Sequence, residues 1–299
     1  MMFGTRDEFA YLECVECGTV QIDEIPDLEP YYPASYYSFE ASGSKGAVSV
    51  KKRLSEFAAR AFYASRHLPF SNALFRIADL NARLIDRGLG LTSVLQLDPP
   101  RDARILDVGC GSAELLRVLA QLRFTSLTGI DKFLTKRNDD GGISLRAAEI
   151  SNVDGQFDLV MFHHSLEHVP DPISALRDAN SRLTTGGNCL VRVPLLSHAW
   201  EKYGTNWVGL DAPRHLVLMT EEAMRRVAEQ AGFEVADVVY DSTSFQFSAS
   251  EKYSLDIPLV AEAEPFPKSQ IRKWNKEAKR LNGLGRGDQA AFFLKKRDV

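Results

Sequence analysis

One stretch of the chain, residues 104–129, constrains the fold more than any other. It begins with a short apolar run, Ile105 to Val108, that is typical of a buried strand. Gly109 and Gly111 follow, and glycine lets a backbone turn sharply beside a ligand. Leucines then recur at helical spacing, at Leu115, Leu116, Leu119 and Leu122. The stretch therefore predicts a strand, a turn and a helix that meet at residues 109–112, where an α/β sheet binds a nucleotide-like cofactor.

The carboxylates around this turn indicate which cofactor binds there. A dinucleotide site has a third glycine for close helix packing, and this chain has Glu114 after Ala113 instead. Asp107 stands two residues before the first glycine, where a carboxylate suits a cationic ligand better than a pyrophosphate. S-adenosylmethionine carries both an ammonium and a sulfonium. Asp131, at the end of the next predicted strand, is placed to accept hydrogen bonds from two ribose hydroxyls, of an adenosyl group or of NAD.

At these residues the chain resembles the class I S-adenosylmethionine-dependent methyltransferases, whose first motif is commonly D-x-G-x-G, here Asp107 to Gly111. The resemblance covers residues 101–299, apart from one insertion. Matching segments are the fourth strand and its loop at Phe157 to Val169, the fifth strand at Leu183 to Val193, the turn into the sixth at Ala231 to Val235, and the antiparallel seventh at Asp288 to Lys295. The resemblance implies a doubly wound, mostly parallel, seven-stranded Rossmann-like α/β sheet and S-adenosylmethionine as the cofactor. It also implies the cofactor-binding residues Asp107, Gly109, Cys110, Gly111, Asp131, Glu149, Phe162 and His163, with Glu149 near the adenine amino group and the backbone of Phe162 and His163 beside the cofactor.

A narrower likeness is to bacterial small-molecule methyltransferases found among polysaccharide and secondary-metabolite genes. Those chains commonly open with a zinc ribbon and a tyrosine-rich stretch, here Tyr31 to Tyr37, and often carry a segment like Pro213 to Leu216. In this chain only Cys14 and Cys17 are present, and no other Cys or His precedes His67. A closed structural zinc site needs about four ligands, so we expect a degenerate ribbon remnant without metal.

Composition is that of an ordinary globular protein and argues against several other classes. The chain has 299 residues and a net charge of −4, which argues against non-specific nucleic-acid binding. It has no apolar run of about 18 residues and no secretion signal at its N-terminus, so we expect a cytoplasmic protein that acts on a small molecule, without a membrane or nucleic-acid partner. Cys110 and Cys189 fall in a predicted turn and strand rather than in a disulfide framework. The oligomeric state does not follow from the sequence.

Three regions are expected along the chain. Residues 1–48 form an N-terminal lobe, and residues 49–100 contain two helices, at Lys51 to His67 and Ser71 to Arg87. Residues 101–299 form the cofactor-binding core, with an insertion at about 248–287 that contains a basic helix from Lys268 to Arg280. A basic run of this kind is either an anion site or a solvated helix face.

Methyl transfer to a hydroxyl requires a group that removes its proton, and histidine suits this role. His215 is our first candidate for the catalytic base and His164 the second, while His168 is expected to support the fold. The loop before His215 carries Trp200, Tyr203 and Trp207, which either line an acceptor pocket or cover the edge of the sheet. The predicted acceptor is a small hydroxylated molecule such as a sugar or nucleotide sugar. An N- or C-methyltransferase, a non-catalytic cofactor-binding or scaffold protein, and an NAD-dependent oxidoreductase remain alternatives.

Overall fold

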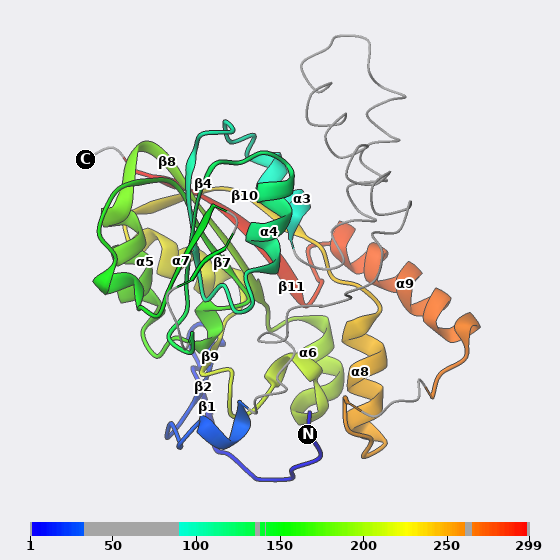
Figure 1. Ribbon diagram of the computed structural model, residues 1–299. Coiled ribbons are helices and arrows are strands. Elements are labelled where there is room, and N and C mark those ends of the chain that lie inside the picture. Colours follow the sequence, from blue (N-terminus) through cyan, green and yellow to red (C-terminus); the bar gives the residue numbers. More distant parts are fainter. Residues whose placement is uncertain (1, 33–89, 135–137, 141, 261–264, 298–299) are drawn as a thin grey trace. The chain divides into compact units, whose positions relative to one another are not determined.

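The computed structural model describes residues 2–32, 90–134, 138–140, 142–260 and 265–297 (Figure 1). The two helices expected at 51–67 and 71–87 and most of the tyrosine-rich stretch lie outside the described residues. The chain divides into two compact units. We call Ala34–His163 with Arg182–Leu190 the central unit, and Met1–Pro33 with His164–Ser181 and Val191–Val299 the terminal unit.

Parallel strands form the core of the central unit. Strand β3 pairs in parallel with β4 on one side and β7 on the other, and β4 pairs in parallel with β6. Their bounds are β3 Arg104–Val108, β4 Ser126–Ile130, β6 Ile143–Arg146 and β7 Phe157–His163. β3 confirms the predicted apolar run at Ile105 to Val108 to within a residue, and β7 begins at Phe157 as predicted, because both are buried in the sheet. β6 instead alternates buried and half-buried residues.

Helix α4, Glu114–Gln121, follows β3 as predicted. Its apolar stripe is buried through Leu115, Leu116 and Leu119. The helix begins two residues later than the sequence suggests, since Ala113 adopts a left-handed φ of 59° before it.

Strand β8, Leu183–Pro194, begins in the central unit and ends in the terminal unit. In the terminal unit β10, Phe233–Tyr240, pairs antiparallel with β11, Gln289–Lys296. The hydrogen-bonded strand order is β10-β11-β8-β7-β3-β4-β6-β5. The seven predicted strands of the mostly parallel sheet are therefore present, and β5, Asn138–Asp140, adds a short antiparallel edge that was not predicted.

Helix α7, Glu221–Gln230, has the ends that its sequence predicts. The Thr220 hydroxyl accepts a hydrogen bond from the Ala223 N–H at 3.1 Å, which satisfies one of the unpaired donors of the first turn. Gly232 follows the helix with a φ of 85°, a conformation that favours glycine. Helix α5, Pro172–Arg182, also matches its prediction.

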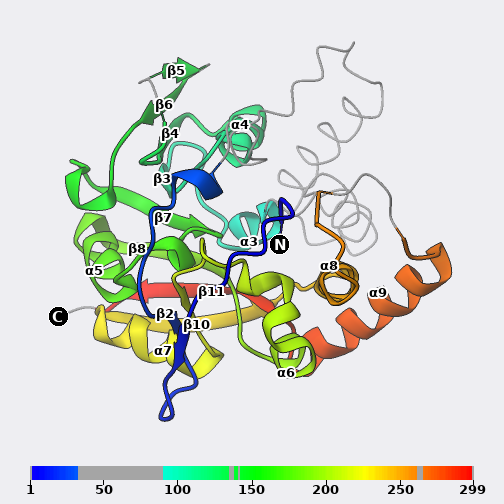
Figure 2. The ribbon, with the colours of Figure 1, turned by 90° about the horizontal axis from the view of Figure 1, so that it is seen from below.

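A small second sheet joins the chain's beginning to a later loop. Strands β1, Tyr11–Glu13, and β2, Val20–Ile22, form an antiparallel hairpin around Cys14 and Cys17, and β2 also pairs with β9, Val217–Leu218 (Figure 1). Figure 2 shows the hairpin from below as the blue ribbon at β2. The hairpin therefore packs beside the segment that follows His215.

The predicted insertion contains two helices, α8, Phe245–Ser254, and α9, Lys268–Gly283. The basic side chains of α9 are exposed, as a solvated helix face would be. The remaining helices are α3 Leu91–Gln96, α6 His198–Tyr203, and the short 3-10 turns η1 Glu29–Tyr31, η2 Ile150–Asn152, η3 Leu166–His168, η4 Gly204–Asn206 and η5 Val208–Leu210. Within the described ranges, no helix combines the length and the apolar character needed to cross a membrane.

Candidate active site

The glycine turn after β3 has the geometry that its sequence predicts. Gly109 and Gly111 adopt φ values of 74° and 49°, which L-residues with side chains rarely adopt. The N–H groups of Gly109 and Cys110 both donate to the carbonyl of Ile130, at 2.8 and 3.0 Å. These bonds hold the turn against the end of β4.

Asp107, in β3 two residues before Gly109, is a buried carboxyl group. Its side chain is only 3% exposed, and no described residue forms a hydrogen bond with Oδ1. Burial, followed by the nearby charge of Asp131, raises the pKa of Asp107 to about 8. A bound ammonium would reverse this effect and satisfy Oδ1, so the residue fits a cationic cofactor.

Asp131 connects the end of β4 to the glycine turn. Its Oδ2 accepts a hydrogen bond from the Gly111 N–H at 3.1 Å, and its Oδ1 accepts one from the Phe133 N–H at 2.9 Å. Each carboxylate oxygen can accept a further hydrogen bond, which leaves capacity for the predicted ribose hydroxyls.

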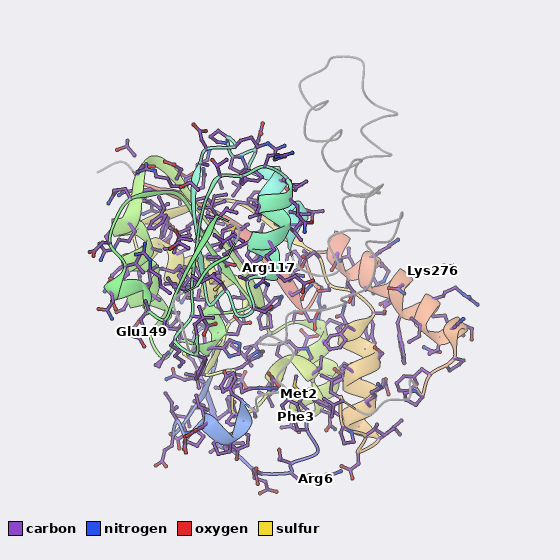
Figure 3. All side chains as sticks on the ribbon, viewed as in Figure 1. Met2, Phe3, Arg6, Arg117, Glu149 and Lys276 are labelled. Atoms are coloured by element: carbon purple, nitrogen blue, oxygen red, sulfur yellow. The ribbon has the colours of Figure 1, made fainter. Side chains whose placement is uncertain are left out.

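The other predicted cofactor residues differ in what their side chains can do. Cys110 has a thiol pKa raised by burial, so the thiol stays protonated. Phe162 is fully buried near the carboxyl end of β7, and His163 follows it as the last residue of the strand. Glu149 is exposed and precedes the η2 turn (Figure 3), where its carbonyl accepts from the Asn152 N–H at 3.0 Å.

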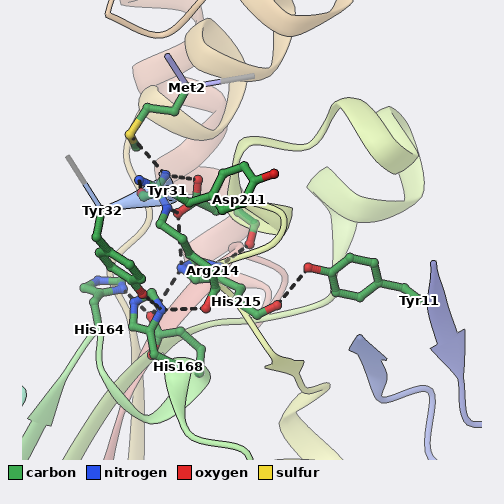
Figure 4. Close-up of polar contacts among 11 residues, drawn as sticks. Met2, Tyr11, Tyr31, Tyr32, His164, His168, Asp211, Arg214 and His215 are labelled. Atoms are coloured by element: carbon green, nitrogen blue, oxygen red, sulfur yellow. Dashed lines mark hydrogen bonds and ion pairs between the residues drawn. The ribbon is translucent and has the colours of Figure 1, made fainter. Parts of the chain in front are cut away.

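In the terminal unit the two predicted bases, His164 and His215 (Figure 4), both approach the carboxylate of Glu167, which was not among the predicted site residues. Glu167 is 1% exposed, and its Oε1 lies 3.3 Å from Nδ1 of His164 and 3.9 Å from Nε2 of His215. His168 is next to Glu167 in η3, and its ring centroid lies 4.8 Å from that of His215. We call these four residues the histidine–glutamate cluster.

Hydrogen bonds fix the tautomer of His164. The Arg192 guanidinium, which can only donate, lies 2.6 Å from Nε2, so Nε2 carries the lone pair and Nδ1–H donates to Glu167. Partial burial of the ring and the charge of Arg192 lower the pKa of His164 to about 3. Arg192 in turn donates to Asp241 at 2.6 Å. Both ring nitrogens of His164 are thus engaged.

His215 has one ring nitrogen left for chemistry. Its Nδ1 lies 2.7 Å from the Gly209 carbonyl and must donate to it, which leaves the lone pair on Nε2. The pKa of His215 falls to about 4, mainly because of burial and against the opposing charge of Glu167. The ring is therefore neutral near pH 7, as a base or a metal ligand must be.

The N-terminal lobe encloses Arg214, the neighbour of His215 (Figure 4). Arg214 is 3% exposed, pairs with Asp211, and lies 3.1 Å from the Met2 sulfur. The Tyr32 hydroxyl lies 3.3 Å from Nδ1 of His168. Residues of the N-terminal segment therefore contact both the His215 loop and His168.

The aromatic residues before this loop are mainly structural. Trp207 is fully buried in a hydrophobic cluster and donates from Nε1 to Asp288 at 3.1 Å. Trp200 packs against Trp207 with a centroid distance of 6.2 Å, and the Tyr203 hydroxyl donates to Glu251. Trp207 is therefore a core residue of the terminal unit.

Comparisons with known proteins identify the family. A model of the methyltransferase-domain family matches residues 76–238, which is more than half of the chain. The chain belongs to this family and is an S-adenosylmethionine-dependent methyltransferase, as the turn, the strand order and the buried Asp107 lead us to expect.

Two relatives and one solved structure illustrate the similarity. A ubiquinone biosynthesis O-methyltransferase of Methylobacterium sp. (strain 4-46) is 27% identical over 186 residues, 55% of this chain and 74% of that protein. The protein of the same name from Pseudomonas aeruginosa (strain LESB58) is 33% identical over 96 residues, 28% of this chain and 41% of that protein. This second alignment spans less than half of the relative's length. An S-adenosylmethionine-dependent methyltransferase structure from Mesorhizobium loti matches with a TM-score of 0.46 and 16% identity, over 68% of this chain and 96% of that one.

Proposed function

We propose that this enzyme transfers the methyl group of S-adenosylmethionine to a hydroxyl oxygen of a small metabolite, with sugars and nucleotide sugars as the first acceptor class. The observation that carries the proposal is the buried histidine–glutamate cluster, with the lone pair of His215 Nε2 beside Glu167. Oxygen methylation also has support from the O-methyltransferase names of the two relatives.

On the cofactor side, S-adenosylmethionine supplies an electrophilic methyl group when it is bound. Asp107 would face its ammonium, because the unpaired Oδ1 needs a cationic or hydrogen-bonding partner. Asp131 would accept from the ribose hydroxyls while it holds the glycine turn. Cys110, the backbone of Phe162 and His163, and Glu149 complete the proposed set.

On the acceptor side, the hydroxyl must lose its proton as the oxygen becomes methylated. In the metal-free protein His215 is the leading base, since Nε2 is unprotonated near pH 7 and Nδ1 is fixed by the Gly209 carbonyl. His164 is the reserve, because Arg192 and Glu167 occupy both of its nitrogens.

The proposal is tested with a methyl donor labelled on the transferred carbon. Purified protein is offered panels of sugars, nucleotide sugars and small phenols, and the labelled product is analysed to locate the methyl group. We expect an oxygen-linked methyl on one acceptor class, and slower product formation by Asp131→Ala when the cofactor is limiting, because that variant binds it more weakly. A nitrogen- or carbon-linked methyl would overturn oxygen transfer, and tight cofactor binding without any product would favour a non-catalytic role.

A further inference from the structure

Three members of the cluster are arranged as metal ligands. Glu167, His168 and His215 each offer one ligand atom, and the three atoms lie within 4.8 Å of one another. Glu167 and His168 come from η3 after β7, whereas His215 comes from the loop before β9 (Figure 4). Over the described parts of the chain, no other group of three His, Cys, Asp or Glu residues has this geometry.

Both imidazoles are oriented by backbone carbonyls, as metal-binding histidines usually are. Nδ1 of His168 lies 2.8 Å from the Arg214 carbonyl, and Nδ1 of His215 lies 2.7 Å from the Gly209 carbonyl. A carbonyl only accepts, so each Nδ1 carries a hydrogen and each Nε2 carries a lone pair. The two rings thus present unprotonated nitrogens without any change of tautomer.

The Glu167 carboxylate has one unsatisfied oxygen, which a bound cation would satisfy. Glu167 is 1% exposed, and within the described residues its Oε2 has no hydrogen-bond partner. Its Oε1 and Nε2 of His215 lie 3.9 Å apart with no hydrogen to share, because the nitrogen holds only a lone pair. A buried, unsatisfied carboxylate oxygen is unfavourable, and a bound cation would satisfy both groups.

A second layer of residues holds the carboxylate in place. His164 donates from Nδ1 to Glu167 at 3.3 Å and receives a hydrogen bond from Arg192, which is anchored by Asp241. His164 also adopts a left-handed φ of 50°, an uncommon conformation for a residue with a side chain. Such supporting contacts orient ligands and raise metal affinity by about 10- to 100-fold.

We propose that Glu167, His168 and His215 bind one divalent ion of the zinc type, Zn²⁺ or its spectroscopic substitute Co²⁺. Two imidazoles and one carboxylate suit these ions better than Mg²⁺, which prefers oxygen ligands. In a tetrahedral site with ligand distances of about 2.0–2.2 Å, ligand atoms lie about 3.3–3.6 Å apart, so small side-chain rotations bring the 3.9 Å pair and the third ligand atom to the ion. Asp211 is not included as a ligand, because Arg214 occupies its carboxylate.

Three protein ligands leave an open coordination position. If the proposed function holds, this position takes the acceptor hydroxyl, whose pKa the ion lowers so that the proton passes to solvent water. His215 is then a ligand rather than the base. This role rests on the proposed function, whereas the ion site itself does not.

The experiment is a Co²⁺ titration of chelator-treated full-length protein, followed by visible absorption and by bound metal per chain. We expect one Co²⁺ per wild-type chain, competed by Zn²⁺, and at least tenfold weaker binding in Glu167→Gln and in His215→Gln. His198→Gln is the matched control on α6, outside the cluster, and Cys14→Ser controls for the hairpin cysteines. Both should bind Co²⁺ as the wild type does.

A supporting-layer variant protects the test against loss of folding. His164→Asn keeps all three ligands and should weaken Co²⁺ binding by about tenfold, with an unchanged far-ultraviolet circular dichroism spectrum. The site is wrong if the wild-type protein does not bind one Co²⁺ per chain. It is also wrong if the folded variants Glu167→Gln and His215→Gln bind Co²⁺ as tightly as the wild type. Co²⁺ binding without any methylated acceptor counts against the proposed function alone, and methylation unaffected by chelation counts against the ion's role at the hydroxyl.

Discussion

The buried carboxyl of Asp107 should make the stability of the cofactor-free protein depend on pH. The unfolded chain loses this proton near pH 4, whereas the folded protein keeps it up to about pH 8. The folded state therefore binds more protons between these values, and stability falls as pH rises through this window. Each pKa unit corresponds to about 1.4 kcal/mol, so we expect a loss of about 2 to 4 kcal/mol between about pH 5 and about pH 8.

The variant Asp107→Asn removes the titrating group while keeping the side-chain volume. Urea unfolding of both proteins without cofactor, at several pH values from about 5 to 8, gives the difference in unfolding free energy at each pH. The wild type should lose about 2 to 4 kcal/mol relative to the variant across the series. A difference in unfolding free energy that is the same at every pH would reflect other effects of the amide. Parallel curves of unfolding free energy against pH for the two proteins would therefore refute the raised pKa of Asp107.

The same group should release a proton when the cofactor binds. At pH 7 a carboxyl with a pKa of about 8 is roughly nine-tenths protonated, and an adjacent ammonium would ionise it. Calorimetry of S-adenosylhomocysteine binding in buffers with different ionisation enthalpies measures the protons released. The wild type should release close to one proton more than Asp107→Asn, which should also bind at least tenfold more weakly. Equal proton release would show that Asp107 does not face the ammonium.

Three further predictions concern other parts of the molecule. Asp131→Ala should weaken cofactor binding by about 1 to 3 kcal/mol, measured by calorimetry, because a charge-assisted hydrogen bond to ribose is lost; an unchanged dissociation constant in folded protein would exclude that role. Elemental analysis should find no zinc held by Cys14 and Cys17, so Cys14→Ser should leave the metal content unchanged, and metal lost with this substitution would contradict us. His215→Ala should lower turnover about a hundredfold with cofactor affinity nearly intact, and full turnover in both this variant and His164→Ala would exclude base catalysis by either residue.

The strands of the sheet were predictable because each is encoded locally. A short apolar run such as Ile105 to Val108 has few alternatives when it is followed by a glycine turn and an amphipathic helix. Helix α8 was missed for the opposite reason. Its buried residues, from Gln246 to Tyr253, lie all around the helix, so no apolar stripe marks it in the sequence.

The histidine–glutamate cluster could be predicted only in part. His164 and His215 were selected because histidines are chemically versatile, but their meeting point at Glu167 depends on how the loop before β9 returns to η3. The Leu216 N–H donates to the Glu167 carbonyl at 2.8 Å, a contact between residues far apart in sequence. The available signal was the adjacent pair Glu167 and His168 directly after a buried strand, which we had assigned to the fold.

Asp107 in the central unit and Glu167 in the terminal unit are both buried carboxyl groups. Each has one oxygen to which no described residue forms a hydrogen bond. The groups beside the two carboxyl groups differ, and therefore the ligands that they suit differ too. Among the described residues, the carboxylate of Asp131 is the charged group that raises the pKa of Asp107, and no imidazole is part of this set, which suits an organic ammonium better than a zinc-type ion. Glu167 lies beside imidazole lone pairs that are aimed by backbone carbonyls, which suits a transition-metal ion. Exchanging the two probes tests this reasoning: S-adenosylhomocysteine affinity should be unchanged in Glu167→Gln, and Co²⁺ affinity should be unchanged in Asp107→Asn.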